Sequence, residues 1–194
     1  MRSNGPGQSP LLLLDVIDIL NKLNVPCAVV GALAASFYGT IRASMDADAI
    51  ISFPNDKENS RTLLSELVKT GFEAALTRGD IHDPVAGVIN IKDNYSNRVD
   101  LLTGIRGMKA DAFSRTIDVP FSGGKIRIIG LEDFIAMKIF AASPKDIEDA
   151  KNALEVSADR INPVLLKELV SSYGKGALKT FRKLLKEVKN SRKS

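Results

Sequence analysis

The most constraining feature of this sequence is a strand, a glycine and a short helix that lead into a second strand with two acids. Apolar residues predict a buried strand over Ala28–Val30, and Gly31 follows it. Small residues then predict a helix over Ala32–Tyr38, and a second strand follows over Asp46–Phe53. Helices that alternate with strands in this way indicate a mixed α/β or α+β domain.

The rest of the chain first continues this alternation and then changes to helices only. Apolar residues at helical spacing predict helices, and short apolar runs bounded by turn residues predict strands. The predicted elements are helices over residues 11–23 and 57–70, strands over 73–77, 87–92 and 98–103, a short helix over 110–115, a hairpin over 117–129, and helices over 131–142, 144–156, 163–173 and 177–189. We therefore expect a disordered N-terminus over residues 1–10, a small mixed sheet flanked by helices over residues 11–130, and a helical C-terminal region over residues 131–194.

Composition limits the compartment and the chemistry. Cys27 is the only cysteine, so an intramolecular disulfide or a cysteine-based zinc cluster is excluded. The apolar runs are far shorter than the roughly 18 residues of a membrane span, and we expect a cytoplasmic protein without membrane association. The net charge of +4 is concentrated near the C-terminus, where residues 175–193 contain eight Lys or Arg and one acid, Glu187. This basic face is either ordinary solvated surface or an RNA phosphate contact.

Three aspartates on predicted strands point to a metal site. Asp46 and Asp48 lie two positions apart, so their side chains point to the same face of a strand, about 6.6 Å apart. Asp100 lies inside an apolar strand, where an unpaired charge would be costly to bury. Carboxylate oxygens suit Mg²⁺, which is often held by one or two carboxylates together with substrate phosphates. The alternative is that the first two acids are solvated and that Asp100 pairs with Arg98 or Arg42.

A glycine and a lysine extend this prediction toward an anionic ligand. Gly31 lies between an apolar strand and the start of a helix, where free backbone N–H groups can bind a triphosphate. Lys138 falls on the apolar face of its predicted helix, so it either extends its ammonium group to solvent or contacts a buried anion. We favour the anion, either a nucleotide phosphate or an acid of the metal site.

These residues together resemble the nucleotidyltransferase superfamily built on the polymerase-β-like palm. Within it, the chain resembles the branch that contains the bacterial type IV abortive-infection toxins. The matching residues are Val30-Gly31-Ala32 for the glycine turn, Arg42 and Asp46-Ala47-Asp48 for the arginine and paired acids, Asp100 for the third acid, and Lys138-Ile139-Phe140-Ala141 and Lys145-Asp146-Ile147-Glu148-Asp149 for the helical motifs. The resemblance covers roughly residues 25–156 and implies a palm domain over residues 11–130.

The resemblance implies Mg²⁺-dependent transfer of a nucleoside monophosphate from an NTP, such as ATP, to an acceptor hydroxyl. It implies an acceptor on RNA such as tRNA, or on a protein, and a toxin role with a cognate antitoxin. Two Mg²⁺ ions, or Mn²⁺ in their place, would be held by the three aspartates. The implied catalytic residues are Asp46, Asp48, Asp100 and Lys138, and the implied nucleotide-binding residues are Gly31, Ala32, Arg42, Lys145 and Asp146.

A second interpretation rests on three departures from the family pattern. Val30 and Ala32 replace the usual small or hydroxyl residues of the glycine turn, and Ser143 stands where an arginine is usual. These changes favour, as the alternative, a catalytically reduced palm that binds nucleotide, nucleic acid or a partner without turnover.

Overall fold

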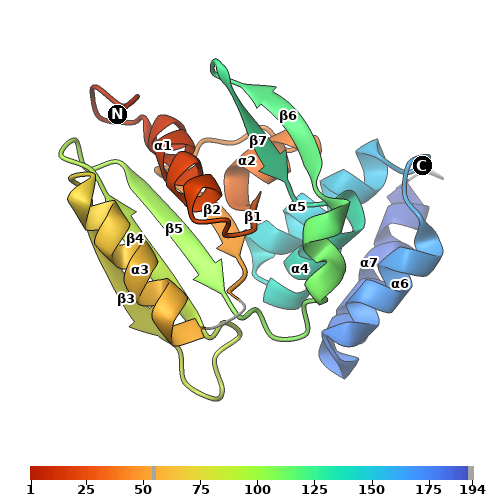
Figure 1. The fold of residues 1–194 in the computed structure, drawn as a ribbon. Coiled ribbons are helices and arrows are strands. Elements are labelled where there is room, and N and C mark those ends of the chain that lie inside the picture. Colours follow the sequence, from red (N-terminus) through yellow and green to blue (C-terminus); the bar gives the residue numbers. More distant parts are fainter. Residues whose placement is uncertain (54–55, 192–194) are drawn as a thin grey trace.

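The computed structural model describes residues 1–53 and 56–191, and it arranges helices around one mixed sheet (Figure 1). The elements, in chain order, are α1 (Ser9–Lys22), β1 (Cys27–Val29), α2 (Gly31–Phe37), β2 (Asp46–Ile51), α3 (Asp56–Lys69), β3 (Glu73–Arg78), β4 (Gly87–Lys92), β5 (Arg98–Thr103), the 3₁₀ helix η1 (Ala110–Arg115), β6 (Ile117–Phe121), β7 (Gly124–Ile128), α4 (Leu131–Ala141), α5 (Pro144–Val156), α6 (Pro163–Ser172) and α7 (Lys175–Ser191). The α/β class and the order of helices and strands predicted from the sequence are confirmed.

The sheet has seven strands in the order β3-β4-β5-β2-β1-β7-β6. Strands β2 and β5 are neighbours and run parallel, although 46 residues separate Ile51 from Arg98 in the sequence. Their register pairs Asp48 with Asp100, while β4 pairs Asn90 with Asp100 from the other side. The parallel pairing of β2 and β5 thus brings acids from two distant segments to one place on the sheet.

One face of this sheet is covered and the other is open. Helices α1 and α3 lie across the face of β2 to β5 (Figure 1), and the side chains that point toward them are buried. These residues occupy alternate positions along each strand: Ala47, Ala49, Ile89, Ile91, Val99 and Leu101 are fully buried. Because successive strand residues point to opposite faces, Asp46, Asp48 and Asp100 lie on the open face.

The C-terminal helices pack against one another beside the sheet (Figure 1). Helix α4 contacts α5, α6 and α7, and the amphipathic helix α7 buries Phe181, Leu184 and Val188. Polar contacts also tie this helical region to the sheet domain. Arg115 of η1 pairs with the buried carboxylate of Asp133 in α4, and the hydroxyl of Tyr38, just after α2, donates a 2.5 Å hydrogen bond to the carbonyl of Ile129, just before α4.

The N-terminal segment differs from the sequence expectation of disorder over residues 1–10. Ser3 is buried, and its hydroxyl donates a 2.7 Å hydrogen bond to Asp93 in the turn before β5. The backbone N–H of Gln8 donates to the side chain of Asn97 in the same turn, and α1 already begins at Ser9. Polar composition at the start of the chain predicted a free segment, whereas these hydrogen bonds to a distant turn fix it.

None of the helices in the described part of the chain combines the length and the hydrophobicity that are needed to cross a membrane.

Candidate active site

Three carboxylates form the centre of the candidate site. Asp46 and Asp48 come from β2 and Asp100 from β5, and all three are partly buried. One oxygen atom from each carboxylate lies within 4.8 Å of the corresponding atoms of the other two. Three like charges at this separation repel one another, and hard oxygen donors of this kind bind divalent cations such as Mg²⁺ or Mn²⁺. The donor set therefore fits the predicted metal site.

The pKa of Asp48 reflects the close approach of the three carboxylates. Burial, together with the negative charges of Asp46 and Asp100, raises the pKa of the Asp48 carboxyl to about 6. Lys138 and Arg42 act in the opposite direction without cancelling the rise. A group whose charged form is disfavoured by burial and by like charges gains most from a nearby cation.

Two polar side chains that we did not predict from the sequence orient the acids. The Ser44 hydroxyl donates a 2.5 Å hydrogen bond to Oδ1 of Asp46, and the Asn90 amide donates a 2.9 Å hydrogen bond to Oδ1 of Asp100. Asn90 is a polar residue within the apolar strand β4, which was the only local signal of its role. Asp100 therefore has Asn90 as its partner, and the alternative pairing with Arg98 or Arg42 is not the one formed.

Gly31 is required by the close approach of Asp48. Its φ angle is +59°, and a Cβ atom built on it would lie 1.9 Å from Oδ2 of Asp48. Any other residue would therefore displace the carboxylate or distort the start of α2. The strand β1 runs beside β2, and the N–H of Val30 donates to the carbonyl of Asp48, which holds the glycine at this position.

A cleft of about 350 Å³ opens beside the acids, between the sheet and helices α4 and α5. It brings together most of the predicted site residues, from both parts of the chain: Gly31, Arg42, Asp46, Asp48, Lys138, Lys145 and Asp146. Asp100 lines a neighbouring hollow on the open sheet face, and Asp46 lines both. Ala32 is buried in α2 and is not among the described residues that line the cleft.

The cations of the cleft are held by carboxylates of α5. The ammonium group of Lys138 lies 2.7 Å from Oδ1 of Asp146 and 2.8 Å from Oδ2 of Asp149, and Arg42 lies 3.2 Å from the same oxygen of Asp149. Burial would raise the pKa of Asp146, but hydrogen bonds from Lys138 and Ser143 bring it below its ordinary value. In this structure, Lys138 therefore contacts one buried and one partly buried carboxylate, and both belong to α5 rather than to the three acids of the sheet.

Asp149 belongs to the helical motif recognised in the sequence, but it was given no role there. Its side chain is only 1% exposed, and it pairs with both Arg42 and Lys138. A buried charge of this kind needs its partners close by, so Asp149 fixes where the two cations stand. Ser143 caps α5 by accepting from the N–H of Asp146, and its hydroxyl donates to the Asp146 carboxylate.

The comparison with known families agrees with this geometry. Residues 13–186 match the profile of a family described as nucleotidyltransferase of unknown function (DUF6036). The chain belongs to this family. The match spans both the sheet domain and the C-terminal helices, the two regions that form the cleft in this chain.

Solved structures of a nucleotidyltransferase and of a nucleotidyltransferase-like protein share the fold. ANT(2″)-Ia in complex with adenylyl-2″-tobramycin is 15% identical, with a TM-score of 0.56 over 84% of this chain and 94% of that chain. An antigenic nucleotidyltransferase-like protein from Paracoccidioides brasiliensis is 14% identical, with a TM-score of 0.51 over 90% of this chain and 87% of that chain. No sequence match was found among curated proteins. At these identities the similarity establishes the fold, and the predicted nucleotidyltransferase superfamily is confirmed by the family match.

Proposed function

We propose that this protein is a Mg²⁺-dependent nucleotidyltransferase that transfers a nucleoside monophosphate from an NTP to an acceptor hydroxyl. The observation that carries the proposal is the group of three carboxylates on β2 and β5, which borders a cleft lined by Arg42, Lys138 and Lys145. Clustered acids beside clustered cations suit a metal-bound triphosphate, because the acids bind the metal and the cations offset the phosphate charge.

Each part of the site has a proposed role. Asp46, Asp48 and Asp100 would hold the divalent ions, Mg²⁺ or Mn²⁺, which when bound polarise phosphate oxygens and lower the pKa of an attacking hydroxyl. Ser44 and Asn90 keep two of the carboxylates oriented through their hydrogen bonds.

The cations differ in how accessible they are. Lys138 is already paired with the buried carboxylate of Asp149 and the partly buried carboxylate of Asp146, whereas Lys145 is exposed at the edge of the cleft. We propose Lys145 as the residue that first meets the outer phosphates, with Lys138 and Arg42 setting the positive potential behind it. The contact of the Gly31 and Ala32 amides with phosphate, and a direct role for Asp146 in nucleotide binding, stay predictions.

For the acceptor we propose RNA, such as tRNA, with a protein hydroxyl as the competing acceptor. The support for RNA is the exposed basic face of α7, which includes Lys179, Arg182, Lys183 and Lys186. The toxin role and a cognate antitoxin rest on the resemblance of the motifs to the abortive-infection branch, and a cytoplasmic location goes with them. Growth arrest on induced expression that is lost in Asp46→Asn would support the toxin role.

The first test is the melting temperature of the purified protein with Mg²⁺ and each NTP. We expect stabilisation that needs both ligands, that is lost in Asp46→Asn, and that is kept in the exposed control Asp159→Asn. The absence of any response in the unsubstituted protein would refute a nucleotide role.

A second test separates turnover from binding. The protein is incubated with labelled NTP, Mg²⁺ and either total tRNA or total cell protein, and label on the macromolecule is measured. Label that depends on Asp46 identifies the acceptor class. Thermal stabilisation without transfer would instead favour the alternative of a catalytically reduced palm that binds nucleotide without turnover.

A further inference from the structure

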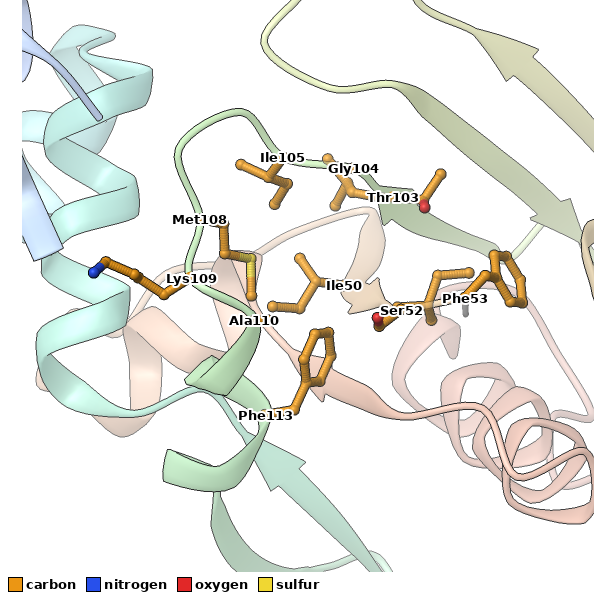
Figure 2. Close-up of a pocket in the computed structure, with 12 residues that line it drawn as sticks. Ile50, Ser52, Phe53, Thr103, Gly104, Ile105, Met108, Lys109, Ala110 and Phe113 are labelled. Atoms are coloured by element: carbon orange, nitrogen blue, oxygen red, sulfur yellow. The ribbon is translucent and has the colours of Figure 1, made fainter. Parts of the chain in front are cut away.

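A second, apolar hollow lies just beyond the acids along the same two strands. It has a volume of about 220 Å³ and is closed on one side by the segment that follows β5. Figure 2 shows the side chains of Ile50, Met108 and Phe113 gathered in it, with Ile105 above them. We call this hollow the apolar pocket and define it by Ile50, Leu102, Ile105, Met108 and Phe113.

The strand geometry places this pocket next to the acids. Ile50 follows Asp48 by two residues, and Leu102 follows Asp100 by two residues, so these side chains share a face of the sheet. Two residues of a strand span about 7 Å, which sets the distance from the acids to the pocket. Leu102 also lines the cationic cleft, so the pocket and the cleft adjoin each other beside the acids.

The three hollows around the acids differ in the charge of their lining residues, and therefore in the kind of ligand that each can bind. The cleft holds the cations, which suit phosphates. The hollow on the open sheet face contains the polar and charged residues Asn90 and Arg98 and suits a polar acceptor. The apolar pocket has one cation, Lys109, which points away from it (Figure 2) and lies 3.1 Å from Glu168 of α6. Apolar side chains and the polar groups of Ser52, Thr103 and the backbone together line this pocket, so a flat group with apolar faces and polar edges is the ligand that fits there.

The wall of the pocket is fixed in place by the C-terminal helices. The Ser172 hydroxyl of α6 donates a 2.7 Å hydrogen bond to the carbonyl of Gly107, in the middle of the segment between β5 and η1. The N–H of Arg106 donates to the carbonyl of Pro84, which fixes the same segment from the other side. A pocket whose walls are already held in position binds a ligand with less loss of conformational entropy.

We propose that the apolar pocket binds the nucleobase of the NTP whose phosphates lie in the cationic cleft. This proposal rests on the proposed nucleotidyltransferase function and adds the place of the base. In an NTP, a ribose separates the base from the α-phosphate. The pocket lies two residues along β2 and β5 from the acids that would bind the metal at that phosphate, so the spacing suits a base. The ring of Phe113 offers an aromatic contact to the base, and the hydroxyls of Ser52 and Thr103 lie among the lining residues, where the polar edge of a base needs partners.

The test compares an NTP with tripolyphosphate, which has the phosphates but no base. Dissociation constants are measured by calorimetry for ATP, GTP, CTP, UTP and tripolyphosphate, all with Mg²⁺. We expect at least one NTP to bind the unsubstituted protein roughly tenfold or more tightly than tripolyphosphate, because the base adds apolar burial. In Ala110→Trp, which adds a bulky ring at an exposed lining position, this advantage should fall to within about twofold while tripolyphosphate binding is unchanged.

The matched control is Ala158→Trp, which places the same ring at an exposed position in the turn after α5 and should keep the advantage of the NTP. Met108→Ala removes apolar contact from one wall of the pocket, so it should weaken NTP binding and leave tripolyphosphate binding unchanged. This variant replaces Ala110→Trp in the test if Ala110→Trp does not fold. An NTP advantage that survives in both pocket variants would overturn the base assignment. Equal binding of NTP and tripolyphosphate by the unsubstituted protein would overturn it too, while leaving the phosphate site intact. Binding of neither ligand would overturn the proposed function itself.

Discussion

Replacing Asp48 by asparagine should have opposite effects on the metal-free protein and on its response to Mg²⁺. The substitution keeps the size of the side chain and removes one of three crowded negative charges. In the metal-free protein at pH 7.5 it should raise the free energy of unfolding, because the charged carboxylate is buried beside Asp46 and Asp100. With Mg²⁺ it should abolish stabilisation, because a ligand of the ion is lost.

The magnitude follows from the pKa of Asp48. Its rise from 3.8 to about 6 means that the folded state binds this proton more tightly than the unfolded state. Each pKa unit corresponds to about 1.4 kcal/mol, so the rise amounts to at most about 3 kcal/mol. Solvent screens a partly exposed group, and we expect asparagine to add about 1 to 3 kcal/mol above pH 7.

The pH dependence has a definite sign. A raised folded-state pKa gives a contribution to stability that is complete below the unfolded value near 4 and is lost as the pH rises through about 6. The Asp48→Asn protein lacks this group. Its stability advantage over the unsubstituted protein should therefore be small near pH 4.5, should grow up to about pH 6.5, and should then stay constant.

The assay is urea unfolding in EDTA between pH 4.5 and pH 8, followed by thermal unfolding with and without Mg²⁺. Asp159→Asn, at an exposed position, is the matched control and should show neither effect. If Asp48→Asn were less stable than the unsubstituted protein at pH 7.5 in EDTA, or if the difference did not change with pH, the three carboxylates would not be the repulsive cluster described above.

Other substitutions test the surroundings of the acids by thermal or urea unfolding. Gly31→Ala should cost about 2 kcal/mol more than Gly123→Ala, because both glycines have positive φ angles but only the Gly31 Cβ would overlap the Asp48 carboxylate; equal costs would contradict this reasoning. Asp149→Ala should cost about 3 kcal/mol, since it leaves two partly buried cations without their shared buried carboxylate, and a loss under 1 kcal/mol would show that they find other partners. Ser143→Ala should cost about 1 kcal/mol through loss of the cap of α5, and an unchanged stability would show that the cap contributes nothing.

Local patterns in the sequence were sufficient for the elements and for the three acids that the structure brings together. Alternation of apolar residues located the strands, and the spacing of Asp46 and Asp48 put both side chains on one face of β2. Asp100 stood out as an acid in an apolar strand. These inferences succeed because side-chain direction along a strand repeats every two residues whatever the strand pairs with.

Contacts between segments that are distant in the sequence could not be predicted from such local patterns. The sequence by itself determined which acids lie on strands, where a glycine turn precedes a helix, and that a lysine lies on the apolar face of a helix. Only the tertiary structure decided that β5 lies parallel to β2 with Asp100 beside Asp48, that Gly31 makes room for a carboxylate, and that Lys138 pairs with α5. It also formed the apolar pocket from β2, β5 and the segment after β5. The physical reason is that strand pairing and helix packing depend on the burial of the whole chain, which no single segment contains.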